Sequence, residues 1–267
     1  YEKPENTGKI INTINKFNEA VENINVDLML VPTAYTIYDD KLPYYHRDIS
    51  QLETLNNIYS SVSTSNIDVY PSLMLHRDNE QLFYKLDHHW TTDGAYYAYV
   101  KYCEHKGFTP VPKEDFNIQE VTNDFEGTIY SKLNDYSLEG DVIKVYGYNN
   151  DLTVNYDNKK TTNSLYNMDY VNKKDKYSLF LDNLHSYIEI TNNNINTDRE
   201  LVIAKDSYAN SFIPFLVNHY KKIYVFDPRS YKGSISDFVN EHNNVKDVLM
   251  LYNMNTIDQD TGINAIY

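Results

Sequence analysis

The sequence is poor in cysteine, in basic charge and in long apolar runs. Cys103 is the single cysteine of 267 residues, which excludes an internal disulfide and a zinc site built on several thiolates. No apolar run approaches the roughly 18 residues that a membrane-spanning helix needs. Lys and Arg number 24 against 38 Asp and Glu, and no basic cluster stands out. A nucleic-acid partner, whose phosphates require concentrated positive charge, is therefore not expected.

What remains is the composition of an ordinary soluble domain with many tyrosines. The length fits one large α/β domain, or a domain that carries an insertion. The 27 tyrosines offer flat faces that stack on sugar rings. A compositional bias shared with Asn and Lys is the alternative explanation. Because the chain opens at Tyr1 without a methionine, we expect that an upstream signal or anchor segment was removed.

Helical and extended patterns alternate in the first 107 residues. Apolar positions recur at helical spacing in residues 10–24 and 49–62. Short apolar runs at 26–32 and 67–70 predict strands. This rhythm of strand, helix and strand favours a parallel sheet flanked by helices.

A third helix is predicted directly after Trp90. Thr91 or Thr92 can cap its first turn, and Gly107 is suited to the left-handed residue that ends it after Lys106. Cys103 falls on the apolar face of this helix and is interpreted as a buried helix residue.

The pattern changes at residue 108 and returns at residue 199. Between these points, short strands are separated by Asn- and Asp-rich turns. We therefore predict one α/β domain, residues 1–107 and 199–267, with a β-rich insertion of the same domain at 108–198. Pro214 is expected early in the helix that follows Ser207. The strands predicted in the insertion are 127–130, 142–146, 178–181 and 187–190. After it come strands 201–204, 222–226 and 248–251, with a helix at 235–242.

Ser207 stands between a buried strand and a helix. Such a junction lifts a side chain at the carboxyl edge of a parallel sheet, where the sites of these folds gather. It also puts the Ser207 amide near a helix N-terminus, where it can donate to an oxyanion. Ser207 is therefore a candidate nucleophile, although a serine that only caps the helix would give the same pattern.

Asp87, His88 and His89 include the partners that a nucleophilic serine needs. An imidazole takes the serine proton near neutral pH, and a carboxylate fixes the tautomer of that imidazole. In a loop, Asp87 can bend back toward His89, and His88 then points elsewhere as a loop histidine. The three side chains could instead bind a metal ion, although the only thiol is distant and no His–x3–His helical pair is present.

The tetrad Asp87-His88-His89-Trp90 resembles the signature of the DHHW proteins. These proteins are similar to the alginate O-acetyltransferases of the SGNH hydrolase superfamily. Further blocks resemble the family in the same order, over nearly the whole chain. The blocks are Met-Leu-Val-Pro-Thr at 29–33 with Ile-Tyr at 37–38, Asp-Phe-Glu-Gly-Thr-Ile-Tyr-Ser-Lys at 124–132, Lys-Asp-Ser-Tyr at 205–208, and Asp-Pro-Arg-Ser-Tyr at 227–231.

The resemblance implies an SGNH-hydrolase-like, flavodoxin-like α/β fold and a catalytic triad. Ser207 would be the nucleophile, His89 the base and Asp87 the residue that orients His89. Because the aspartate and histidine precede the serine here, the motif order resembles the circularly permuted arrangement of the alginate-type enzymes. The oxyanion donors stay open, since Lys205 replaces a small residue of the family. The candidates for oxyanion or substrate binding are the Ser207 amide, Arg229, Asn210, Tyr130, Lys132 and Tyr208, and Arg229 could instead only pair with Asp227.

The resemblance also implies a reaction and a location. The chain is expected to move an acetyl group, through a serine acyl-enzyme, onto hydroxyls of an exported or cell-surface polysaccharide. A membrane-bound O-acyltransferase partner would supply the acetyl group outside the cytoplasm, and no metal or diffusible cofactor is required. The β-rich insertion and exposed tyrosines would line the sugar groove. Two alternatives stay open: a carbohydrate acetylesterase with the same triad, and a non-catalytic glycan-binding scaffold.

Overall fold

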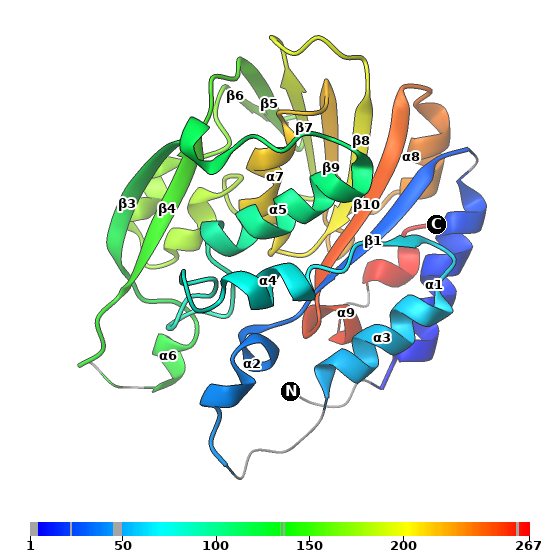
Figure 1. Cartoon of the computed structure of the whole chain (residues 1–267). Coiled ribbons are helices and arrows are strands. Elements are labelled where there is room, and N and C mark those ends of the chain that lie inside the picture. The colour runs from blue at the N-terminus through cyan, green and yellow to red at the C-terminus, as the bar shows by residue number, and fades with distance from the viewer. Residues whose placement is uncertain (1–4, 22, 45–49, 134, 136, 260–261) are drawn as a thin grey trace.

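An eight-stranded sheet forms the centre of the molecule (Figure 1). The computed structural model describes residues 5–21, 23–44, 50–133, 135, 137–259 and 262–267. The strand order in this sheet is β2-β1-β10-β8-β9-β7-β5-β6. The strands are β1 (Asn25–Val31), β2 (Ser65–Asn66), β5 (Leu152–Tyr156), β6 (Lys160–Thr162), β7 (Tyr187–Asn192), β8 (Glu200–Lys205), β9 (Lys222–Phe226) and β10 (Val245–Asn253).

The sheet is parallel on one side and antiparallel on the other. Strands β2, β1, β10, β8 and β9 run parallel to one another, which confirms the predicted parallel sheet for this part of the molecule. Strand β7 then pairs with β9 in the antiparallel sense, and β5 and β6 continue from it. Three strands of the segment 108–198 therefore extend the central sheet. The proposed division of the chain into catalytic domain and insertion stays a prediction.

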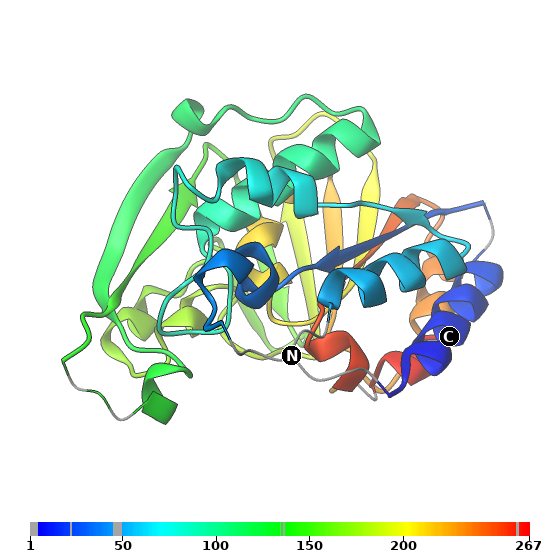
Figure 2. The same cartoon turned by 60° about the horizontal axis from the view of Figure 1, so that its bottom comes forward.

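Helices cover both faces of the sheet, as the turned view shows (Figure 2). Along β1, Met29 and Val31 lie in the core shared with α4, α5 and α7, whereas Leu28 and Leu30 lie in the core shared with α1, α3 and α8. This alternation is the two-residue period of a strand that is buried on both faces. The longer helices are α1 (Thr7–Ala20), α3 (Gln51–Ser61), α4 (Tyr70–His76), α5 (Thr92–Lys106), α7 (Ala209–Leu216) and α8 (Ile235–Glu241), and the short ones are α2 (Ala34–Ile37), α6 (Tyr130–Leu133) and α9 (Thr256–Gln259).

Helix α5 begins and ends at the predicted residues. Thr91 accepts a hydrogen bond from the Gly94 amide at 3.2 Å, which satisfies one of the free donors of the first turn. Gly107 adopts a φ of 70°, the left-handed geometry that glycine takes without a steric cost. The helix therefore starts at a fixed point, two residues after Trp90. Cys103 is buried on this helix, as predicted.

A second, small sheet and core build the remaining part of the segment 108–198. β3 (Asn117–Phe125) pairs with β4 (Asp141–Gly147) in the antiparallel sense. Two short 3₁₀ helices, Met168–Asn172 and Lys176–Leu179, lie in the same segment. Apolar side chains from this sheet, from the second 3₁₀ helix and from the loop before α5 form what we call the small core. Its buried residues are Tyr84, Phe125, Ile143, Val145, Tyr177, Leu179 and Phe180.

Four local predictions are wrong. Residues 127–130 form the turn into α6, and residues 67–70 lead into α4. Of residues 178–181, the first two end a 3₁₀ helix, and Phe180 forms an isolated bridge with Tyr166. A short apolar run cannot distinguish a strand from another buried segment, because it is too short to show a period. Pro214 lies sixth in the eight-residue α7 instead of early.

Many tyrosines serve the core of the protein. Tyr99, Tyr102, Tyr156 and Tyr220 are among the largest fully buried side chains. The abundance of tyrosine therefore reflects packing as well as surface. No helix in the described ranges is long and apolar enough to cross a membrane. Tyr1, on which the expected upstream segment depends, lies outside the described residues, as does the first residue of the predicted helix 49–62.

Candidate active site

Asp87, His89 and Ser207 meet at one point of the structure. His89 Nε2 lies 2.8 Å from Ser207 Oγ, and His89 Nδ1 lies 2.5 Å from Asp87 Oδ1. Asp87 and His89 come from the loop that precedes α5. Ser207 follows β8 at the carboxyl edge of the parallel strands, and α7 begins two residues later. The arrangement has the geometry of a nucleophile, a base and a group that orients the base.

The Asp87 carboxylate is held on both sides. Its Oδ1 accepts from the His89 ring and, at 3.1 Å, from the His89 amide. Its Oδ2 accepts from the amide of Thr128 at 2.9 Å and from the Thr128 hydroxyl at 3.1 Å. Burial raises the pKa of Asp87, but the hydrogen bond and charge of His89 outweigh it, and the pKa falls well below its usual range. The carboxylate stays ionised and acts as an acceptor only.

Gly127 makes room for this carboxylate. A Cβ atom at residue 127 would stand 2.3 Å from the Cβ of Asp87 and 2.4 Å from its Oδ2. The block at 124–132, which resembles the family pattern, thus supplies the space for Asp87 and, through Thr128, two of its hydrogen bonds.

Trp90 and Tyr208 join the two halves of the site. The Trp90 indole donates to the carbonyl of Tyr208 at 2.9 Å, and the Tyr208 hydroxyl donates to the carbonyl of His88. The Tyr208 amide donates to Asp206 Oδ1 at 2.8 Å. Both donors of Tyr208 are therefore used within the protein. Its predicted role in oxyanion or substrate binding stays a prediction, and these hydrogen bonds show that Tyr208 joins the two halves of the site.

Asp206 fixes the turn that carries Ser207. Besides the Tyr208 amide, its carboxylate accepts from the amide and the side chain of Asn253, each at 2.7 Å. Asp206 is fully buried, and Asn253 ends β10 next to β8. The Asp-Ser pair of the sequence block therefore combines a buried anchor with a partly exposed hydroxyl. Ser207 does not cap α7 with its side chain.

The oxyanion candidates lie in different surroundings. The Ser207 amide meets no hydrogen-bond acceptor among the described residues, so it is available to a ligand. Asn210 is buried, and its side-chain oxygen has no donor within the same set of residues. Arg229 donates to both oxygens of Asp227, at 2.8 and 2.5 Å, as the salt-bridge alternative predicted.

Tyr130 and Lys132 lie in α6, just after Thr128. The Tyr130 amide donates to the carbonyl of Leu86 at 3.0 Å, which fixes α6 against the loop that carries Asp87. Lys132 is exposed. The structure therefore puts both on the segment that holds Asp87, and their predicted role in substrate binding stays a prediction.

Tyr177 and Thr128 are contacts of the triad that we did not predict from the sequence. The Tyr177 ring lies on the His89 ring with a centroid distance of 3.7 Å and an interplanar angle of 9°. Tyr177 comes from the small core and precedes Ser207 by 30 residues. No local pattern in the sequence marks it, because its neighbours form a short 3₁₀ helix without periodicity. Thr128 lies in the block 124–132 that resembles the family pattern, and this block is the sequence signal that could have indicated its role.

A metal ion would compete with this network. Metal ions bind to His, Cys, Asp and Glu side chains. Within the described part of the chain, one group of three such side chains has its ligand atoms within 4.8 Å of one another, and it consists of Asp87, His88 and His89. Both oxygens of Asp87 and both ring nitrogens of His89 already have hydrogen-bond partners. His88 Nδ1 lies 2.8 Å from the Thr128 hydroxyl. These partners favour a triad over a metal site.

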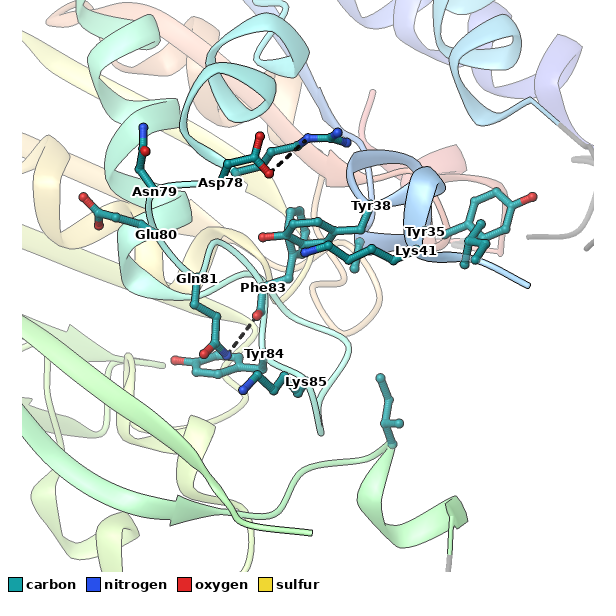
Figure 3. Close-up of a pocket in the computed structure, with 14 residues that line it drawn as sticks. Tyr35, Tyr38, Lys41, Asp78, Asn79, Glu80, Gln81, Phe83, Tyr84 and Lys85 are labelled. Carbon is teal, nitrogen blue, oxygen red and sulfur yellow. Dashed lines mark hydrogen bonds and ion pairs between the residues drawn. The ribbon is translucent and has the colours of Figure 1, made fainter. Parts of the chain in front are cut away.

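A pocket of about 710 Å³ opens beside the loop that leads to Asp87 (Figure 3). Tyr35, Tyr38 and Phe83 contribute aromatic rings to it, and Lys41 and Lys85 contribute cations. Lys41 Nζ lies 4.5 Å from the centroid of the Tyr38 ring. Figure 3 shows how these side chains gather around the space between α2 and the loop. Ile129, which follows Thr128, lines the same pocket.

Comparison with known proteins identifies the family. A sequence model described as DHHW protein matches residues 6–226. A solved DHHW family protein from Eubacterium siraeum is 26% identical, with a TM-score of 0.87, and the match covers 99% of this chain and 89% of that one.

Two further solved structures share the fold. PatB1 of Bacillus cereus, solved with a sulfonyl adduct, is 19% identical with a TM-score of 0.80, over 100% of this chain and 94% of that one. The O-acetyltransferase domain of AlgJ from Pseudomonas putida is 10% identical with a TM-score of 0.55, over 97% of this chain and 87% of that one. No curated protein sequence matches this chain. Because the matched residues span most of its length, the chain belongs to the DHHW protein family.

Proposed function

We propose that this chain is a serine-dependent O-acyltransferase that acetylates hydroxyls of a polysaccharide. The observation that carries the proposal is the contact of 2.8 Å between His89 Nε2 and Ser207 Oγ, with the other nitrogen of His89 on Asp87. A serine with such a base forms acyl-enzymes. The permuted order of the triad within an SGNH-like fold is part of this proposal, and the likeness to the AlgJ domain supports it.

The first half of the reaction forms an acyl-enzyme. His89 Nε2 takes the proton of Ser207 Oγ, and the oxygen attacks the carbonyl carbon of an acetyl ester. The ionised Asp87 stabilises the imidazolium that results. The oxyanion of the tetrahedral intermediate accepts a hydrogen bond from the Ser207 amide, which has no other described acceptor. The intermediate then collapses: the bond to the donor alcohol breaks, and that oxygen takes the proton from His89.

The second half transfers the acetyl group to a sugar. A sugar hydroxyl gives its proton to His89 Nε2 and attacks the acyl carbon, and Ser207 leaves with that proton. The aromatic rings of Tyr35, Tyr38 and Phe83 suit the faces of sugar rings, and the pocket that they line lies beside the catalytic loop. We place the acceptor there.

The source of the acetyl group and the location follow from the family resemblance. We propose that a membrane-bound O-acyltransferase supplies acetate outside the cytoplasm, and that the acceptor is an exported or cell-surface polysaccharide. Labelling of intact cells with a membrane-impermeant reagent tests the location. Absence of label on this protein in intact cells, with labelling after lysis, would overturn it.

Hydrolysis of an artificial acetyl ester tests the triad. Ser207→Ala and His89→Ala are expected to lower kcat by about 10³-fold or more, because each removes a member of the triad. Ser63→Ala and His105→Ala are matched controls, since both lie near the amino end of β1, away from the triad. A Ser207→Ala variant with wild-type activity would refute the assignment of the nucleophile.

Adding an oligosaccharide to the same assay distinguishes the rival functions. A transferase yields acetylated sugar, whereas an acetylesterase yields only acetate. A glycan-binding scaffold gives no turnover in the wild type, and its sugar binding is unchanged by Ser207→Ala.

A further inference from the structure

Tyr177 contacts both the base and the residue of the nucleophile. Its ring lies nearly parallel to the His89 ring, at a centroid distance of 3.7 Å and an angle of 9°. Its hydroxyl lies 3.0 Å from the Ser207 carbonyl oxygen and 3.2 Å from the hydroxyl of Ser211, a buried residue of α7. A single side chain from the segment 108–198 therefore connects the two parts of the triad.

The His89 ring is enclosed by this contact. Asp87 and Ser207 take its two nitrogens in the plane of the ring. The His88 ring lies 3.9 Å away at an angle of 37°. No contact between the rings of His88 and Tyr177 occurs among the described residues, so the two rings lie on opposite faces of His89. Rotation of the His89 ring about its Cβ–Cγ bond would disturb all four contacts.

Tyr177 itself is firmly held. It is buried in the small core, where its ring meets Phe180 at 5.1 Å and Tyr84 at 6.4 Å. The carbonyl of Leu179 accepts from Asn167 at 2.8 Å, which ties down the same short helix. Burial raises the pKa of the Tyr177 phenol, so the side chain stays neutral and keeps its donor. The ring thus presents an uncharged aromatic face to His89.

An aromatic face distinguishes the two protonation states of an imidazole. The negative charge density of the ring face attracts a cation and interacts less with a neutral group. His89 becomes a cation when it takes the Ser207 proton. An interaction that is stronger after this transfer lowers the barrier to acyl transfer more than it stabilises the resting enzyme.

We infer that Tyr177 is a positioning residue that fixes the plane of His89 and stabilises its imidazolium during acyl transfer. The inference rests on the proposed function, because it needs Ser207 to lose its proton to His89. It also assigns a role to the small core. This core holds Tyr177 against His89, whereas the triad itself is built from the loop before α5 and the turn after β8.

Substitutions of Tyr177 test the inference with the acetyl-ester assay. Tyr177→Phe keeps the ring and is expected to retain most of kcat. Tyr177→Leu removes the aromatic face and is expected to lower kcat by about 2-fold to 30-fold, with KM nearly unchanged. Tyr166→Leu is the matched control. It packs against the same core and its hydroxyl bonds the Tyr146 carbonyl at 2.9 Å, but it does not touch the triad.

A second measurement separates the charge effect from packing. Tyr177→Phe variants with one to three ring fluorines keep the shape of the ring and withdraw electron density from its face. We expect kcat to fall stepwise with each fluorine, whereas thermal stability stays nearly constant. This series remains informative even if Tyr177→Leu fails to fold.

The outcomes separate this inference from the function on which it rests. The rate at which a sulfonyl fluoride labels Ser207, read by mass spectrometry, needs the base and the nucleophile but no acyl donor. If the wild type neither labels nor turns over, the proposed function fails and this inference fails with it. If the wild type is active, a folded Tyr177→Leu variant with wild-type kcat, or a flat fluorine series, overturns the inference alone.

Discussion

Only glycine fits at residue 127, because Asp87 occupies the space that a side chain there would need. We predict that Gly127→Ala lowers kcat by about 10²-fold, since a Cβ at 2.3 Å from Asp87 displaces the carboxylate that orients His89. Ester hydrolysis measures the effect. Gly8→Ala is the control, because no atom lies within 4 Å of the added methyl group. Wild-type activity in Gly127→Ala would mean that His89 does not need Asp87 where it now lies.

Lys205 is a buried cation beside the turn of Ser207. Its Nζ lies 3.9 Å from the Asp227 carboxylate, and burial lowers the pKa of Lys205 to about 8. An unfolded lysine titrates at about 10.4. Between these two pKa values the unfolded chain binds more protons than the folded one, so this residue makes stability rise with pH across that window.

Lys205→Met removes this dependence. We predict that the variant is more stable than the wild type at about pH 7.5, and that its advantage shrinks by about 2 kcal/mol on going to about pH 9.5. Urea unfolding at both pH values measures the difference in the free energy of unfolding. An advantage that does not change with pH would show that Lys205 is not buried as a cation.

At the residue scale, the sequence predicts those side chains that a local block marks. Asp87, His89 and Ser207 lie in short blocks with family resemblance, and the structure brings them together. Tyr177 could not be predicted, because its contact with His89 depends on how the small core packs. The hydrogen bonds of Tyr208 to the His88 carbonyl and the Asp206 carboxylate could not be predicted either, because they too depend on how distant segments pack.

At the scale of elements, Gly107 is the residue whose backbone ends α5. We predict that Gly107→Ala lowers the free energy of unfolding by about 1 kcal/mol, because alanine is strained at a φ of 70°. No atom lies within 4 Å of the added methyl group, so the cost is one of backbone conformation alone. Urea unfolding measures it, and activity should be unchanged. A neutral substitution would mean that the end of α5 relaxes freely.

Elements were predicted best where a segment has clear end signals or is apolar at nearly every position. The helix of α5 and the strands β1, β8, β9 and β10 follow from periodicity and from clear end signals. The short runs at 127–130 and 178–181 predict strands, yet the first forms a turn into α6 and the second only the end of a 3₁₀ helix and the residues after it. In both places the segment is shaped by contacts with the catalytic loop and the small core, and local propensity cannot report such contacts.

At the scale of the whole molecule, the sheet of mixed direction unites segments that the sequence separates. The parallel strands were expected from the alternation of strand and helix. The antiparallel extension by β7, β5 and β6 was not, because nothing in a single strand indicates its partner. The same limitation hid the small core, whose residues come from before and after α5.

The bond between His89 and Ser207 spans 118 residues of chain. The two residues meet only in chains in which the long segment between them has been closed, and this closure costs conformational entropy. A nascent or partly folded chain therefore carries a base without its nucleophile and cannot act on esters around it. Under the proposed function, turnover therefore reports only those molecules in which these two distant segments have come together.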